Sequence, residues 1–172
     1  MANNSKSTKT IPVVVAIVIT TMTIASLNNS GALLPIASAQ SKPDNVLGTI
    51  ASLQNGKNGK PEWVTSGIVD FKGLNSNSPT FNAAFNMFIL NGSAAHKHTI
   101  TDFKMTGSPS TNGNTTIYNG TATVSLKAGP AKDVPISIKL MEDSAVSIWV
   151  DPSKTENHFG NTPIYGAQHR IA

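Results

Sequence analysis

The sequence predicts an all-β fold, a single antiparallel β-sandwich or barrel of about seven or eight strands. Apolar residues alternate with polar ones along several segments, which is the period of a half-buried strand. Clusters of Asn, Gly, Ser and Pro separate these segments, and no window keeps helical spacing over three turns. Short strands joined by such turns are typical of sandwiches and barrels.

The first 39 residues have the layout of a secretory signal peptide. Lys6 and Lys9 precede a mostly apolar run from Ile11 to Ile24, and Ala37-Ser38-Ala39 supplies the small residues of a cleavage site. The run is short for the ~20 apolar residues that a spanning helix needs. We therefore expect cleavage after Ala39 and a secreted protein. The alternative is that the N-terminal hydrophobic helix is not cleaved and anchors the protein in the membrane.

The remaining residues, 40–172, are long enough for one domain with its own core. Cysteine is absent from the chain, which excludes a disulfide framework, thiolate metal ligands and a cysteine nucleophile. The formal net charge of +4 includes two lysines of the signal segment, and Lys and Arg form no run. We expect no nucleic-acid partner, because such partners require a clustered basic surface.

The β domain is expected to span residues 46–172, after a polar linker at 40–45. Its first two strands are predicted at 46–53 and 63–72, around the Asn-Gly-rich turn 54–60. The second strand should turn one face inward, which carries Trp63, Thr65, Gly67, Val69 and Phe71.

The next two strands are predicted at 80–90 and 94–105, on either side of an Asn91-Gly92 turn. In the first of them one face is apolar throughout, with Phe81, Ala83, Phe85, Met87 and Ile89. The second carries two histidines and a mixed pattern that does not determine which side is wet. A Ser/Gly/Asn/Pro loop is expected at 107–114.

Three more strands are predicted at 115–127, 134–141 and 145–150. The residues expected to be buried in the first two are Ile117, Ala122, Val124, Leu126, Val134, Ile136, Ile138 and Leu140. From residue 151 onward we expect an irregular tail, in which Asp151 caps a short helical turn and Gly160 ends it.

The histidines provide one chemical hypothesis. His96 and His98 are two residues apart, so in a strand they share a face at about 6 to 7 Å between Cα atoms and could converge on one ion. The remaining ligands would come from His158, His169 or Asp102. Without cysteine, such a site suits copper or zinc. The alternative is that these histidines are polar surface residues without a metal.

Three Asn-x-Ser/Thr sequons, at Asn91, Asn114 and Asn119, are potential N-glycosylation sites in an exported protein. Asn119-Gly120 could equally be a simple turn. The chain has no nucleophile-elbow, Walker or dinucleotide-binding motif, so no catalytic residues are assigned.

The histidine segment also resembles the metal-binding motifs of cupins. Gly92, His96, His98, Asp102 and Gly107 follow the order of the first cupin motif, and Pro163, Gly166 and His169 follow the second. Asp102 stands where that motif has Glu, the gap between the first Gly and the histidine pair is short, and the second motif is spaced differently. The resemblance implies a metal site on His96, His98, Asp102 and His169.

A resemblance that covers nearly all of the mature chain is to small secreted proteins of ammonia-oxidising archaea. It is carried by GTIASLQNGKNGKPEWVTSG, FNAAFNMFILNGSAAHKHTITDFK, YNGTATVSLKAGPAKDVPISIKL and SIWVDPSKTENHFGNTPIYG. It implies export to the pseudo-periplasm or the cell surface, in copper-rich surroundings, and brings no catalytic residues.

Taken together, the sequence favours a non-enzymatic extracellular binding or structural protein. The alternatives are a histidine-based copper or zinc protein at the cell surface and a cupin-like metal-dependent enzyme. Measuring whether the purified protein contains metal distinguishes the first hypothesis from the two metal-binding alternatives.

Overall fold

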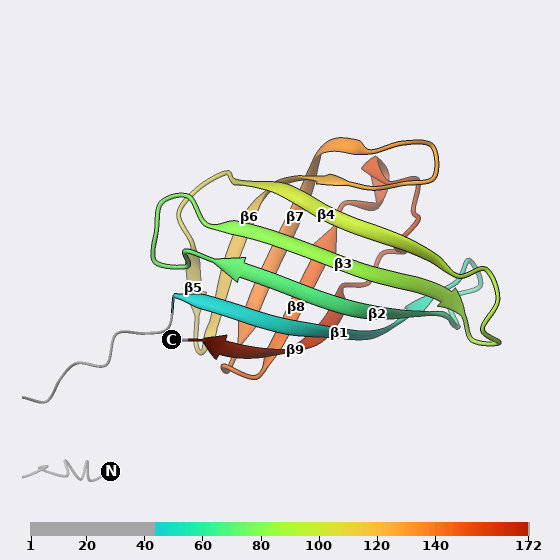
Figure 1. The fold of residues 1–172 in the computed structure, drawn as a ribbon, viewed down its shortest axis with the longest axis horizontal. Coiled ribbons are helices and arrows are strands. Elements are labelled where there is room, and N and C mark those ends of the chain that lie inside the picture. Colours follow the sequence, from blue (N-terminus) through green and yellow to red (C-terminus); the bar gives the residue numbers. More distant parts are fainter. Residues whose placement is uncertain (1–43, 172) are drawn as a thin grey trace, which may run out of the picture. The chain divides into compact units, whose positions relative to one another are not determined.

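The computed structural model describes residues 44–171 and shows a closed antiparallel β-barrel (Figure 1). Eight strands form the barrel, and each pairs with the next until the last returns to the first. The elements are β1 (Asn45–Asn55), β2 (Pro61–Lys72), β3 (Thr80–Ile89), β4 (His96–Met105), β5 (Ser110–Asn112), β6 (Thr115–Val124), β7 (Ala131–Met141), β8 (Ala145–Val150), the 3-10 helix η1 (Pro152–Lys154) and β9 (Ile164–Ile171).

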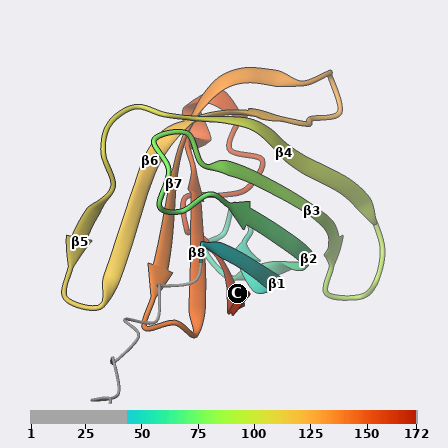
Figure 2. The same ribbon diagram turned by 60° about the vertical axis from the view of Figure 1, so that its left-hand side comes forward.

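The short strand β5 is an addition to the barrel. It pairs with the first residues of β6, whereas β4 pairs with the later residues of the same strand and closes the barrel there (Figure 2). The predicted all-β fold is confirmed, and of the two predicted architectures the structure is the barrel.

The signal peptide predicted at 1–39 lies outside the described residues, as does most of the linker predicted at 40–45. Within the described part of the chain, no helix has the length and apolar character needed to cross a membrane.

The seven predicted strands are confirmed as β1 to β4 and β6 to β8. Their inward faces also agree with the alternation, since the predicted inward rows of β2, β3 and β7 are buried except for the half-buried Trp63, Gly67 and Ile89. The prediction for Ile117 was wrong, because in β6 the even-numbered residues point inward. Tyr118 takes the buried position, and Ile117 is half-buried on the outer side.

The mixed pattern of β4 has a structural cause, a β-bulge. The register between β4 and β6 shifts by one residue between Thr101 and Lys104, and Asp102 has a φ of 56°. A bulge reverses the side to which the following residues point. His98 and Ile100 therefore face the interior before it, and Phe103 faces the interior after it.

The expectation of an irregular tail from residue 151 was wrong for its second half. Residues 164–171 form β9, which pairs with both β1 and β8 and completes the barrel. The strand was not recognised because its inward positions include Gly166 and the buried Gln168, and so do not show an apolar row. β5 was missed because its three residues are polar and exposed.

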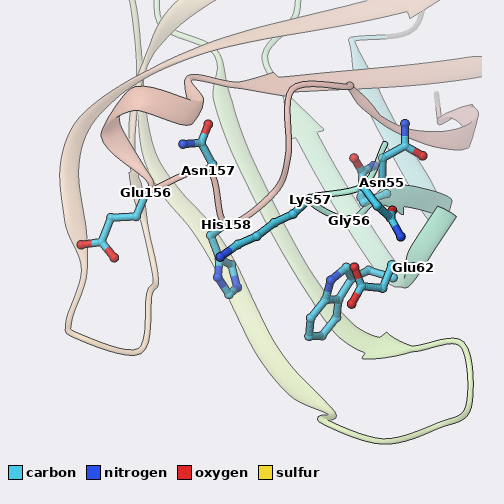
Figure 3. A pocket seen from close by; sticks show the side chains of 10 residues that line it. Asn55, Gly56, Lys57, Glu62, Glu156, Asn157 and His158 are labelled. Carbon is cyan, nitrogen blue, oxygen red and sulfur yellow. The ribbon is translucent and has the colours of Figure 1, made fainter. Parts of the chain in front are cut away.

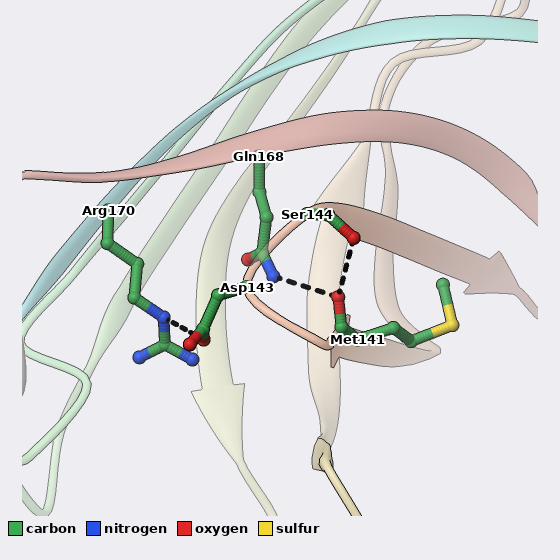
Figure 4. A network of polar contacts seen from close by, with 5 residues as sticks. All are labelled: Met141, Asp143, Ser144, Gln168 and Arg170. Carbon is green, nitrogen blue, oxygen red and sulfur yellow. Dashed lines mark hydrogen bonds and ion pairs between the residues drawn. The ribbon is translucent and has the colours of Figure 1, made fainter.

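A polar network attaches β9 to the β7–β8 hairpin (Figure 4). Gln168 donates from Nε2 to the carbonyl of Met141 at 3.4 Å, and its backbone N–H donates to the carbonyl of Ser144 at 2.9 Å. Arg170 forms an ion pair with Asp143. These contacts fix the closing strand against the turn that it passes.

The two ends of the barrel differ in composition. At the end where β1 begins and β9 ends, Phe71 packs edge-on against Phe81, Phe103 and Tyr118, with ring centroids 4.8–6.0 Å apart. The loop that follows η1 lies at the opposite end (Figure 1). There the first residues of β4 bring histidines to the mouth of the barrel.

Candidate metal centre

Strand β4 places His96 and His98 on the inner side of the barrel mouth. His98 is only 3% exposed, and His96 is half-buried. His98 lies in a cross-strand row with Phe85 and Gly67. A Cβ at Gly67 would lie 2.5 Å from Cα and Cβ of Phe85, which is too close. Glycine at this position therefore allows Phe85 to lie beside His98.

The third histidine, His158, comes from the loop between η1 and β9. Asp151 begins the loop as the N-cap of η1, with Oδ1 accepting from the Ser153 N–H at 2.8 Å. Glu156 and Asn157 then take the left-handed conformation, with φ of 52° and 57°. Two consecutive non-glycine residues of this kind are uncommon, and they turn the chain so that His158 reaches the histidines of β4.

The chain that follows His158 is anchored at two points. Phe159, which follows it, is 2% exposed and packs among the barrel side chains. Further along, the buried side chain of Gln54 donates to the carbonyl of Pro163 at 3.2 Å and accepts from the Thr162 hydroxyl at 2.8 Å. The loop therefore holds His158 in a defined position before any ligand binds.

The three imidazoles converge through their Nε2 atoms. His158 Nε2 lies 2.9 Å from His98 Nε2 and 3.2 Å from His96 Nε2. The three ligand atoms all lie within 4.8 Å of one another. Nitrogen ligands at 2.0–2.1 Å from a tetrahedral metal are separated by about 3.3 Å, so the two distances from His158 Nε2 are close to those of a bound ion.

The tautomers of two rings are fixed by backbone carbonyls. His96 Nδ1 donates to the carbonyl of Ala94 and His98 Nδ1 donates to that of Ser125, each at 2.7 Å. In the neutral rings, both Nε2 atoms then carry a lone pair directed at His158. A single N–H on His158 serves only one of these two acceptors well, whereas a metal ion uses all three nitrogens. Such carbonyl contacts are the usual outer support of metal-binding histidines.

The electrostatics keep two of the rings neutral. Burial lowers the pKa of His98 to about 4; the hydrogen bond to Ser125 partly opposes this shift, and the nearby His158 and His96 add to it. The pKa of His158 is also lowered, first by partial burial and then by His96. Neutral imidazole is the form that binds a metal, so both rings are ready as ligands at neutral pH.

Aromatic side chains line the barrel side of the histidine group, while His158 itself is exposed. Trp63 contacts His96 edge-on, with ring centroids 5.5 Å apart. Phe159 lies against both His98 and His158, at 4.9 and 5.1 Å. These rings exclude water from the barrel side of the site, where electrostatic interactions are strengthened by the low dielectric.

Solvent reaches the site from two open pockets that share His158. The first, of about 460 Å³, includes Trp63, Lys57 and Asn55 (Figure 3). The second, of about 450 Å³, lies between the loop and the segment of Leu126. The site therefore has a closed aromatic side and an accessible side.

The structure brings together three of the five predicted ligands, His96, His98 and His158. His169 is exposed on β9, where it pairs with Leu47 of β1, and it does not join the group. Asp102 does not join it either, because the bulge leaves this residue exposed. The cupin-like set of His96, His98, Asp102 and His169 is therefore not assembled. The sequon residues Asn91, Asn114 and Asn119 are all exposed.

Several residues that shape the site were not singled out by the sequence. Ser125 and Ala94 act through their carbonyls, which any residue type provides, so no sequence signal could have indicated them. Phe159 could have been found, because a single large apolar residue in the otherwise polar stretch 151–162 is a sign of an anchoring contact.

The contribution of the loop anchor is testable through Gln54. The substitution Gln54→Met should destabilise the protein by about 1–3 kcal/mol, because it leaves the Pro163 carbonyl and the Thr162 hydroxyl without their partner. Metal affinity should also fall, since His158 becomes less well held. The control Ser52→Ala removes another acceptor of the same amide but keeps both loop contacts. Chemical denaturation and metal titration of the two variants measure the effects, and equal behaviour would contradict the anchoring role.

Comparison with protein-family models, with curated proteins and with solved structures found no match for this chain.

Proposed function

We propose that this protein is an exported metal-binding barrel that holds one copper or zinc ion on His96, His98 and His158. The observation that carries the proposal is the convergence of three Nε2 atoms, two of them with their Nδ1 atoms committed to backbone carbonyls. Without a ligand, a single Nε2–H of His158 satisfies only one of the two Nε2 lone pairs that face it.

The ligand set favours copper or zinc over harder cations. Imidazole suits both metals, and the affinity of nitrogen sites for divalent metals is highest for copper. The cross-strand neighbour of His96 on the inner face of β3 is Met87, which is fully buried. A thioether is a soft group that is compatible with copper in either oxidation state, so we place copper ahead of zinc.

The metal-dependent enzyme is a second candidate function. Three protein ligands with a further position left open are the arrangement of catalytic zinc sites, whereas structural zinc sites are closed by four protein ligands. The accessible pocket beside His158 supports this reading. A non-enzymatic carrier or surface protein has the same three ligands and would differ in having no turnover.

The export part of the proposal rests on the sequence of residues 1–39. A secreted or cell-surface location is consistent with the exposed positions of the three sequons. Determining the N-terminal residue of the protein from its native source tests it. Gln40 as the first residue supports cleavage, and a retained N-terminal segment would contradict it.

Titration of the metal-free protein with copper(II) and with zinc(II) tests the metal proposal. Calorimetry should give one ion per chain. The variant His158→Ala should bind more than about 100-fold more weakly, because losing a ligand costs more than the 10–100-fold loss typical of an outer-shell residue. The matched control His169→Ala should bind like the wild type. Absence of binding, or equal affinity of His158→Ala and the wild type, would overturn the proposal.

A further inference from the structure

The histidine group leaves a bound metal with an unbalanced charge. Among the described residues, the group contains three histidines and no carboxylate. Three neutral imidazoles do not offset the charge of a divalent ion, and the aromatic rings on the inner side limit its hydration. Coulomb interactions are strong in such surroundings, so an anion that completes the coordination is favoured.

The accessible side of the site offers a place for that anion. Trp63 forms one wall of the first pocket, and His158 borders it. Figure 3 shows Lys57 extending across the pocket toward His158. Within the described part of the chain, Lys57 has no ion pair or hydrogen bond through its ammonium group. It is therefore available to a ligand beside the metal.

Two carboxylates limit the charge of the ligand. Glu62 and Glu156 also line the pocket, although Figure 3 shows Glu156 directed away from Lys57. With a divalent metal, these two carboxylates and Lys57 give the pocket a formal net charge of one positive unit. A monoanion matches this balance, whereas a polyanion such as phosphate would be repelled by the two glutamates.

We propose that the metal has an exchangeable coordination position that takes a small monocarboxylate. One carboxylate oxygen binds the metal, and the other faces the ammonium group of Lys57. The pocket volume of about 460 Å³ suits a small organic molecule whose apolar part lies on Trp63. This inference deepens the proposed function and rests on it, because without the metal the carboxylate has no primary ligand.

The probe is acetate added to the cobalt(II)-loaded full-length protein, in which cobalt(II) reports its coordination through visible absorption. Acetate should change the spectrum in a saturable manner. The variant Lys57→Met should load cobalt equally but bind acetate about fivefold more weakly, the size of effect expected for one exposed ion pair. The control Lys60→Met lies in the same turn without lining the pocket, and it should retain the wild-type affinity.

The outcomes separate the two proposals. If the protein takes up no cobalt, copper or zinc, the proposed function itself fails. If it takes up metal and acetate leaves the spectrum unchanged, metal binding stands and the carboxylate position is overturned. If acetate binds equally well to Lys57→Met, Lys60→Met and the wild type, the part assigned to Lys57 is overturned.

Discussion

Replacing Phe159 with alanine should destabilise the protein by about 3–5 kcal/mol and weaken metal binding as well. The ring of Phe159 is buried and contacts His98, His158 and Phe85, with centroids 4.9, 5.1 and 5.8 Å away. Its removal leaves a cavity beside His98 and His158, two of the proposed ligands. The loop also loses the anchor that follows His158. Metal binding must then supply the free energy that orders His158, and the metal affinity falls by that amount.

The matched control is Phe103→Ala at the other end of the barrel. Phe103 is also buried, and its ring lies against Phe71 and Phe81 at 6.0 and 6.2 Å. Denaturant unfolding of the metal-free variants should show a loss of comparable size in both. Titration with copper or zinc should show weaker binding only for Phe159→Ala. Equal metal affinity in the two variants would contradict the anchoring role of Phe159.

The strands and their buried faces were predictable because alternation is a local property. The rows of β3 and β7 contain an apolar residue at every second position. Burial of this apolar face is enough to determine which side of each strand points into the barrel. The same logic failed for β9, whose inward Gln168 is polar and donates from its side-chain amide and its backbone N–H to residues far away in the sequence. A pattern cannot reveal a polar residue whose partner is distant.

The histidine site was predictable only in part. The pair in β4 follows from strand geometry, and the structure places both rings on the inner face. The bulge at Asp102 could not be inferred, because it depends on the pairing of β4 with β6. The choice between His158 and His169 depended on tertiary structure as well, since the left-handed residues of the loop and the register of β9 decide which ring reaches the mouth.

The position of the site at the mouth follows from how the barrel closes. A β4 strand of fully apolar inner residues would have closed this end as the four aromatic rings close the other. His96 and His98 occupy these inward positions instead, and the loop after η1 supplies His158 together with the apolar cover of Phe159. At this end of the barrel, histidines therefore take positions that apolar core residues would otherwise occupy. Burying imidazole rings in this way is tolerated when the rings are neutral or bind a metal.

Because His98 is buried in this position, the stability of the metal-free protein should depend on pH. The pKa of His98 is about 4 in the folded state, against an ordinary value of 6.5. Between these values the unfolded chain binds a proton that the folded chain does not, so the free energy of unfolding falls as the pH decreases. This stability is fully present above pH 6.5, and about 3 kcal/mol of it should be lost by pH 4. His158, whose pKa is shifted in the same direction, adds to the loss.

Other groups titrate in this range, so the effect must be measured as a difference between variants. In His98→Gln the amide can still donate to the Ser125 carbonyl but cannot take up a proton, so most of the loss between pH 6.5 and pH 4 should disappear. The control His169→Gln removes an exposed imidazole on β9 that lies apart from the histidine group, and it should keep the wild-type profile. Denaturant unfolding at a series of pH values in the presence of a chelator provides the comparison. If the free energy of unfolding changes with pH in the same way in His98→Gln and in the wild type, the barrel does not hold His98 neutral. The idea that His98 is prepared as a metal ligand at neutral pH would then be wrong.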